Sequence, residues 1–186
     1  MWTNFINKGD AILGIHNYEP IFYTDINDFI KDHGEVLKGV IGSTIEEIWT
    51  VHKRMDGEFW ADCPIILIIG GKRLVFCSIR DEISITWGQI DVMRELDWYG
   101  SQESNLEWRK NALSRYHSFI GKTKEDIEVI QRKQEAYDLS GVLLDLELSL
   151  NGIGLNTGDS YLSIFNAFDE TGFTDIKEKN RIYIKI

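Results

Sequence analysis

The sequence has few of the residues that mark metal-binding, disulfide-bonded or membrane-spanning proteins. Its 186 residues include two cysteines and four histidines, and none of these pair at a metal-ligand spacing. Cys63 and Cys77 lie in apolar stretches, typical of buried thiols in a reducing compartment. The longest aliphatic run, Ile65–Ile69, is far shorter than the roughly 20 residues that cross a bilayer. We therefore expect a cytoplasmic protein without metal, cofactor or membrane contact.

Catalytic motifs are also missing. The chain has no phosphate-binding glycine loop, no dinucleotide-binding motif, no nucleophile elbow and no H-E-x-x-H zinc motif. An Asp-Glu pair occurs twice, at 81–82 and 169–170, but neighbouring side chains on a strand point to opposite faces. We assign no catalytic residue. The alternative is an enzyme of unknown class, whose pocket lies between two parts of the fold and includes His52, Asp81 or Cys77.

Basic residues are scarce, and their distribution is uneven. Twenty Lys and Arg stand against 30 Asp and Glu, which gives a net charge of −10 and disfavours nucleic acid as a partner. No Lys or Arg occurs between Gln134 and Ile176, whereas eight acidic residues do. Such a surface attracts a basic protein, although it is also typical of an ordinary solubilising face. The candidate partner-binding residues are Asp145, Glu147, Asp159, Asp169 and Glu170, with Trp98 and Tyr99 as exposed aromatic contacts.

Hydrophobic periodicity predicts many strands and a few helices. Helices are expected over Asp25–His33, ended by Gly34, and over Asn105–Ser118, begun by a capping box of Ser104 and Glu107. A weaker helical pattern covers Gln89–Leu96. Apolar or alternating runs predict strands over Pro64–Ile69, Lys72–Ser78, Glu82–Trp87, Val142–Leu150, Tyr161–Phe165 and Arg181–Ile186. In Val142–Leu150 we expect the even-numbered leucines to face the core, and Asp145 and Glu147 to face solvent.

Two stretches of the chain resemble each other. Ile41–Arg54 and Ile120–Lys133 are identical at five of fourteen positions at an offset of 79. Further on, Leu74 with its Asp-Glu pair and Leu162 with its own match at an offset of 88, so the second copy has nine more residues. We expect the extra residues within Gly152–Ser160, in a hairpin loop. β-Branched residues after Thr44 and Thr123 favour strands over helices there.

These patterns predict an α+β fold of two related antiparallel β-units, produced by internal duplication, with a few helices packed on them. Residues 1–186 are expected to form one compact domain. The first β-unit covers residues 36–90 and the second covers residues 119–186, and a loop and helix at 97–118 connect them.

The phrases WADCPIILIIGGKRLVF and YLSIFNAFDETGF look like parts of uncharacterised bacterial proteins found near toxins. The acidic character of the chain resembles that of small cytoplasmic immunity proteins in bacterial toxin systems. This resemblance implies a non-enzymatic binding protein that neutralises a basic toxin, such as a nuclease, by covering its cleft with carboxylates. A structural homodimer, in which the related halves form an interface, is a further alternative.

Overall fold

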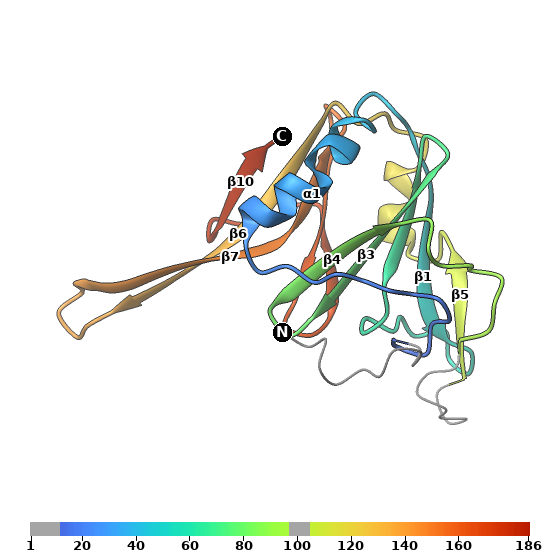
Figure 1. The fold of residues 1–186 in the computed structure, drawn as a ribbon, viewed down its shortest axis with the longest axis horizontal. Helices are drawn as coiled ribbons and strands as arrows, with labels where there is room; N and C mark the ends of the chain where they lie inside the picture. The colour runs from blue at the N-terminus through green and yellow to red at the C-terminus, as the bar shows by residue number, and fades with distance from the viewer. Residues whose placement is uncertain (1–11, 97–104) are drawn as a thin grey trace.

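The computed structural model describes residues 12–96 and 105–186, which form two antiparallel five-stranded sheets (Figure 1). The first sheet has the order β4-β3-β2-β1-β5, and the second has the order β10-β6-β7-β8-β9. The first sheet contains β1 (Ile45–Lys53), β2 (Ile65–Ile69), β3 (Lys72–Ile79), β4 (Glu82–Trp87) and β5 (Leu106–Lys110). The second contains β6 (Asp126–Tyr137), β7 (Leu143–Asn156), β8 (Tyr161–Asn166), β9 (Thr171–Thr174) and β10 (Arg181–Lys185). Helix α1 (Ile26–Lys38) and the 3-10 helix η4 (Ser114–Phe119) complete the described elements.

The two sheets share one apolar core. Phe76 of β3 and Ile153 of β7 are fully buried in the same cluster of side chains. The other face of the first sheet is covered too, because Tyr18 and Ile90 pack there against Val75. Strands β2 and β3 are therefore buried on both faces, which explains why their sequences are almost continuously apolar.

Both sheets have the same strand order relative to the sequence. In each, four consecutive strands form a meander, and a fifth strand returns to pair with the first. Thus β1 to β5 correspond in order to β6 to β10. The first strands of the two sheets begin side by side, because Thr44 and Thr123 form an isolated antiparallel bridge.

The backbone at this junction is locally two-fold symmetric. The amide of Gly42 donates to the carbonyl of Lys124, and the amide of Gly121 donates to the carbonyl of Ile45, both at 2.8 Å. Gly42 and Gly121 both have positive φ, at 80° and 83°. Each pair of corresponding residues is 79 positions apart, so the two bonds are equivalent. The prediction of strands after Thr44 and Thr123 is confirmed.

The helix predicted over Asn105–Ser118 is wrong, because this segment contains β5 and η4. Strand β5 pairs with β1 along its whole length. Trp108 packs into an apolar cluster, whereas Glu107 and Arg109 form an ion pair with 2.6 Å between Oε1 and Nε. This period-two alternation and the strand partner outweigh the capping-box signal. The other residue of that signal, Ser104, lies outside the described residues.

The remaining helix predictions are partly right. Helix α1 begins after Asp25, whose carboxylate accepts hydrogen bonds from two amides of the first turn. It does not end at Gly34, because Leu37 is fully buried and extends the apolar stripe until the cap at Gly39. Residues Gln89–Leu96 form a loop and no helix. Since α1 is the only α-helix among the described residues, the fold is mostly antiparallel β, and the predicted α+β class is wrong about helix content.

The predicted strands are confirmed to within one residue at their ends, except that the strand predicted to end at Leu150 continues to Asn156. The hairpin turn between β2 and β3 contains Gly70 and Gly71, both with positive φ, as two central glycines in such a turn require. The helix expected in the connector at 97–118 is replaced by β5 and η4 where the structure describes that segment. The division into units at 36–90 and 119–186 stays a prediction.

The symmetric junction makes a prediction for Gly42 and Gly121. A Cβ at either position would meet no atom within 4 Å, so each Gly→Ala variant pays only for left-handed backbone, about 1–2 kcal/mol. Urea denaturation should show similar losses of unfolding free energy for Gly42→Ala and Gly121→Ala. Gly39→Ala is the control, because Gly39 has ordinary helical φ of −65°. A loss at only one of the two junction glycines would contradict their equivalence.

Candidate functional site

Strands β6 and β7 continue well past the strands beside them. Strand β10 pairs with β6 as far as Arg132, and β8 pairs with β7 as far as Gly152. Beyond these points single backbone bonds join Lys133 to Asn180 and Leu150 to Thr24, and β6 and β7 otherwise form a ladder with each other, up to Tyr137 and Leu143. We call residues 133–149 the β6–β7 arm. In Figure 1 the arm projects from the sheets as a two-stranded ribbon with no other described element against it.

The arm has a leucine face, on which Lys133 and Glu135 of β6 lie opposite Leu148 and Leu146, and an acidic face with Asp145 and Glu147. Leu144, Leu146 and Leu148 alternate with Asp145 and Glu147 along β7, so the two sets point to opposite sides of the ribbon. The three leucines are 67%, 47% and 44% exposed. The prediction that they face the core is therefore wrong, and only the next leucine in the alternation, at position 150, is buried. The alternation itself is real, but the opposing sheet ends where the arm begins.

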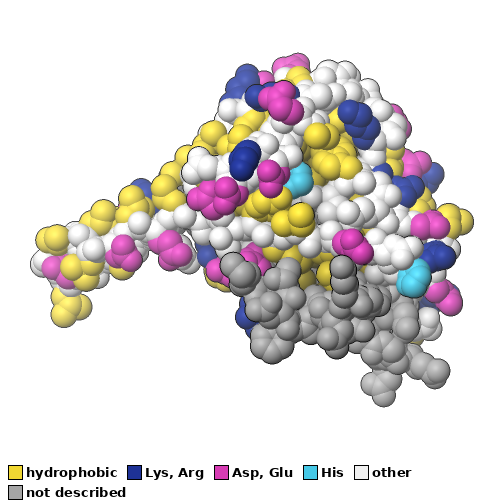
Figure 2. Space-filling model, in the orientation of Figure 1, with side chains coloured by type: hydrophobic (Ala, Val, Ile, Leu, Met, Phe, Trp, Pro, Cys, Tyr) yellow, Lys and Arg dark blue, Asp and Glu magenta, His cyan; other side chains and the backbone are white. Residues whose placement is uncertain are grey.

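Exposed apolar side chains are concentrated on the arm. Seven of the fourteen large hydrophobic residues that are exposed in the described chain lie between positions 137 and 148. They follow the ribbon out to its tip, interleaved with acidic side chains (Figure 2). The seven are Tyr137, Leu139, Val142, Leu143, Leu144, Leu146 and Leu148. A contiguous exposed apolar surface of this kind is typical of an interaction site.

The change of sequence offset from 79 to 88 falls in the part of the chain that contains the arm. At the offset of 88, Gly70 corresponds to Gly158, and both have positive φ in a hairpin turn, at 54° and 83°. The turns match in position, so at these offsets the nine additional residues fall before Gly158, in the part of the chain that contains the arm. Our prediction that they enlarge the loop at Gly152–Ser160 is wrong, because most of that segment is strand.

Local contacts fix the charges and the turn of the arm. Lys133 forms an ion pair with Glu135 at 2.6 Å, and this hydrogen bond lowers the pKa of the Glu135 carboxyl. At the tip, Asp138 accepts hydrogen bonds from Ser140 and from the amide of Val142, and these donors lower its pKa. Both carboxylates therefore stay ionised at neutral pH, and the turn is held by its own aspartate.

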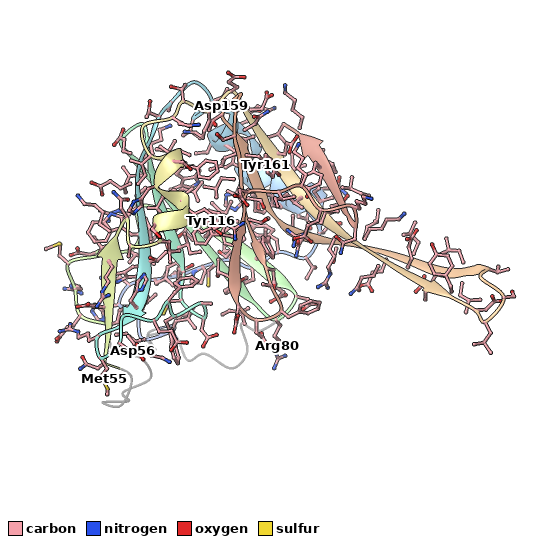
Figure 3. All side chains as sticks on the ribbon, turned by 180° about the vertical axis from the view of Figure 1, so that it is seen from behind. Met55, Asp56, Arg80, Tyr116, Asp159 and Tyr161 are labelled. Carbon is pink, nitrogen blue, oxygen red and sulfur yellow. The ribbon has the colours of Figure 1, made fainter. Side chains whose placement is uncertain are left out.

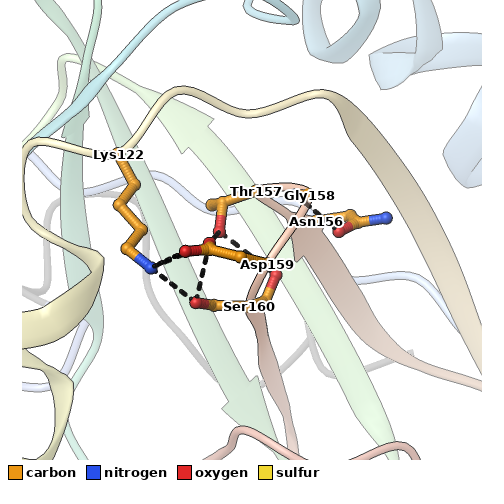
Figure 4. A network of polar contacts seen from close by, with 6 residues as sticks. All are labelled: Lys122, Asn156, Thr157, Gly158, Asp159 and Ser160. Atoms are coloured by element: carbon orange, nitrogen blue, oxygen red, sulfur yellow. Dashed lines mark hydrogen bonds and ion pairs between the residues drawn. The ribbon is translucent and has the colours of Figure 1, made fainter.

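Asp159, another predicted contact, lies away from the arm at the β7–β8 turn. Its carboxylate lies 2.8 Å from the ammonium of Lys122 and also accepts from Ser160, as Figure 4 shows. The hydrogen bond from Lys122 is the main reason why the pKa of Asp159 is lowered. Asp159 therefore stabilises a turn and does not belong to one surface with Asp145 and Glu147.

Asp169 and Glu170 lie at a third place, the β8–β9 turn, beside the β3–β4 turn. The backbone amide of Arg80 donates to the Asp169 carboxylate. Figure 3 shows Arg80 at the opposite end of the sheets from Asp159. Burial, followed by the charges of Glu170 and Asp169, raises the pKa of the nearby Asp62 carboxyl. The structure thus separates the predicted acidic surface into three groups, and Trp98 and Tyr99 lie outside the described residues.

The root of the arm carries two arginines on neighbouring strands. Arg132 and Arg181 are directly opposite each other in the β6–β10 pair. Their guanidinium groups stack on aromatic rings, Arg132 over Phe168 at 4.6 Å and Arg181 over Phe165 at 3.7 Å. The Arg181 side chain is only 7% exposed and also pairs with a glutamate. Both arginines are therefore held by aromatic rings of this protein, on the face of the second sheet that points away from the shared core.

The residues named for an enzymatic alternative do not converge. His52 is buried and its ring nitrogens contact Thr50 Oγ1 and the Gly57 carbonyl, at 2.8 and 2.9 Å. Cys77 lies on the other side of the first sheet from the shared core, and burial raises its pKa to about 12. Asp81 is exposed in a turn. In residues 12–96 and 105–186, no three His, Cys, Asp or Glu side chains are grouped so that they could hold a metal ion.

Within the described chain, no helix is both long and apolar enough to cross a membrane.

Leucines of β7 provide a direct test of the arm. Leu144→Ala, Leu146→Ala and Leu148→Ala remove exposed side chains, so each should change the unfolding free energy by less than about 0.5 kcal/mol. Leu150→Ala in the same strand removes a buried side chain and should cost about 2–5 kcal/mol. Urea denaturation measures all four. If Leu146→Ala lowers the unfolding free energy as much as Leu150→Ala does, the arm does not project into solvent.

Buried Lys124 predicts a pH dependence of stability. Its Nζ donates to the Ser43 carbonyl at 2.8 Å, and burial lowers its pKa from 10.5 to about 8, against a smaller opposing effect of Glu46. Between these two pH values the unfolded chain binds more protons than the folded one, so this lysine makes stability rise with pH.

In Lys124→Met that contribution is absent. The unfolding free energy of the wild type minus that of Lys124→Met should therefore increase from pH 8 to pH 10.5. Comparing the two proteins cancels the titration of the tyrosines. A difference that is constant or falls over this pH range would contradict a lowered pKa of Lys124 in the folded protein.

Comparison with known proteins leaves the function to be inferred from geometry. No protein-family model, no curated protein and no solved structure matches the chain. The arm is the feature from which an inference about function can start, because it combines exposed leucines, an excess of acidic over basic residues and an open position on the molecule.

Proposed function

We propose that the protein is a non-enzymatic binding protein whose β6–β7 arm contacts another protein. The observation that carries the proposal is the row of exposed apolar side chains on the arm, centred on Leu144, Leu146 and Leu148. Keeping these side chains in water is unfavourable, and burying them against a partner recovers about 25 cal/mol for each Å² of apolar area. The second face of the ribbon, with Asp145 and Glu147, adds electrostatic specificity for a partner of opposite charge.

The charge of the arm supports a basic partner. Between Gln134 and Leu148 the chain has four carboxylates and no Lys or Arg, and the net charge of the whole protein is −10. Electrostatic attraction of this kind accelerates association and disfavours acidic partners. In its sharpest form, supported by the resemblance to immunity proteins, the proposal is that the arm enters and blocks the cleft of a basic toxin in the cytoplasm.

Duplication explains how such an arm could arise. We infer that the two sheets descend from one ancestral β-unit, because their strand orders correspond and their first strands begin with equivalent hydrogen bonds. One unit connects its first two strands by the loop of residues 54–64, and the other by the arm. An addition at a hairpin lengthens two strands without disturbing the core, which makes it a favourable place to acquire a binding function.

A homodimer is the second candidate function, because the leucine row would also be buried by another copy of the chain. Sedimentation of the purified protein distinguishes the two. We expect a monomer at micromolar concentration, and a stable dimer that Leu146→Ser abolishes would favour the homodimer instead.

Partner binding can be tested with leucine variants. The full-length protein is used to capture partners from source cells, and the captured protein is then purified for direct affinity measurement. The triple variant Leu144→Ser, Leu146→Ser, Leu148→Ser should weaken binding by at least about 30-fold, because it removes the apolar area that the partner would cover. Ile21→Ser is the matched control, since Ile21 is 67% exposed but lies outside the arm. Equal affinity of the triple variant and the wild type would reject the arm as the contact.

The acidic face can be tested separately through association rates. Reversing the charge with Asp145→Lys and Glu147→Lys should slow association by about tenfold at low salt and reduce the salt dependence of the rate. Asp159→Asn serves as the control, because its carboxylate pairs with Lys122 within the protein. It should leave the association rate unchanged. Loss of affinity from Asp159→Asn alone would place the contact at the β7–β8 turn.

A further inference from the structure

The edge of β7 along the arm is open for hydrogen bonding. At Leu150 the backbone amide points away from β6, because it donates to the Thr24 carbonyl at 3.2 Å. Backbone groups alternate in direction along a strand, so the amides and carbonyls of Leu148 and Leu146 point the same way. At Leu146 this is seen directly, since its amide donates to the carboxylate of Asp145 at 2.9 Å. Strand β8 covers only residues from Gly152 onward.

Resting on the proposed function, we propose that this edge binds an extended segment of the partner as an added β-strand. The partner segment alternates apolar residues with Lys or Arg. A strand added in register places every second side chain beside the leucine row, and the others beside Asp145 and Glu147. The acidic face thus requires cations at alternate positions, whereas the leucine face requires apolar side chains between them.

The chain itself begins this pairing. Thr24, just before the Asp25 cap of α1, supplies one carbonyl to the β7 edge at Leu150. An incoming strand would continue from that point toward the tip. The turn held by Asp138 closes the other end, so the edge accepts a segment of about six residues at one residue per 3.4 Å.

Asp145 covers the edge in the unbound protein. Its carboxylate accepts from the Leu146 amide, and so it occupies a donor that a partner strand needs. Charged groups at sheet edges discourage unwanted pairing. A partner carbonyl would replace the carboxylate on that amide, and a partner Lys or Arg would pair with the carboxylate released. This exchange favours basic strands over neutral ones.

A second copy of the chain fits this edge poorly. In a two-fold antiparallel pair of β7 strands, leucines lie beside leucines in registers centred on Asp145, Leu146 or Glu147. Each of these registers places an acidic residue opposite an acidic residue: Asp145 against itself, Asp145 against Glu147, or Glu147 against itself. Like charges directly opposite are destabilising in a sheet. In these three registers the edge therefore disfavours a copy of this protein and favours a strand of opposite charge.

Synthetic peptides test the proposal without knowledge of the natural partner. The probe is a seven-residue peptide of alternating Val and Lys with blocked ends, titrated against the full-length protein. We expect saturable binding that is at least about tenfold tighter than that of the Val-Glu analogue. A peptide of the same composition with its valines and lysines in separate blocks should lose a similar factor. Equal binding of the alternating and block peptides would overturn the proposal, because charge attraction alone would then explain it.

Backbone methylation distinguishes strand addition from side-chain contact. Two versions of the Val-Lys peptide are N-methylated at alternate amides, one at the Val positions and one at the Lys positions. Only one set of amides faces β7 in an added strand, so one version should lose binding by at least about tenfold and the other should keep it. Similar binding of both versions would overturn the proposal.

A proline at position 146 gives the matching test on the protein. Leu146→Pro removes an amide that β6 does not use, and proline is tolerated on an edge strand. It should abolish peptide binding, whereas Leu146→Ala keeps the amide and should weaken binding less. If Leu146→Pro fails to fold, the methylated peptides decide. If the serine variants of the arm impair partner binding but no peptide binds, the edge site is wrong and the binding function stands. If the serine variants leave partner binding unchanged and no peptide binds, both the edge site and the binding function of the arm are wrong.

Discussion

Burial of two apolar sheet faces against each other is the interaction on which the rest of the structure depends. Phe76 and Ile153 lie in the core that both sheets share, and the sheets begin together at the bridge between Thr44 and Thr123. Apolar side chains on the parts of the sheets that face each other are buried in this core. The arm is defined by where that cover ends, since β6 and β7 extend past Arg132 and Gly152 with no further strand beside them, and the last backbone bonds to neighbours are those of Lys133 to Asn180 and of Leu150 to Thr24.

Leucines on a ribbon that faces solvent on both sides do not stabilise the fold, so their presence points to a partner that covers them. An isolated two-stranded hairpin is marginally stable in water, and the arm is held by the sheet at its root and by the Asp138 turn at its tip. Its leucines add little to folding as long as they stay exposed. Its leucine face, acidic face and open edge are thus available together to a partner. Asp145 lies on the acidic face and also accepts a hydrogen bond from the Leu146 amide at the open edge.

Much of the fold can be predicted from the sequence. Alternation and glycine pairs locate the strands, and the likeness of Ile41–Arg54 to Ile120–Lys133 points to the equivalent beginnings of β1 and β6. Helices are predicted less well, because the capping-box pattern around Glu107 is outweighed by pairing of β5 with β1. Local sequence holds no information about that partner, which is distant in the chain.

The site is harder to predict than the fold. Alternation along β7 shows that the leucines share a face, but it cannot show whether another sheet covers that face. Leu148 and Leu150 are alike in the sequence and differ in exposure, 44% against 1%, because the opposing sheet ends between them. The acidic residues of the stretch 134–176 divide in space among the arm, two turns and Asp175, which follows β9 and pairs with Arg115. The one usable signal is the change of offset from 79 to 88, which marks additional residues near the arm.

Amide hydrogen exchange of the full-length protein, free and bound to its captured partner, tests the central claim most directly. Partner binding at the arm predicts that Leu146 and Leu148 exchange rapidly in the free protein and become protected in the complex, while the turn at Asp159 is unchanged. Protection that appears at the β7–β8 turn or elsewhere on the sheets, with the arm still exchanging rapidly, would contradict the account.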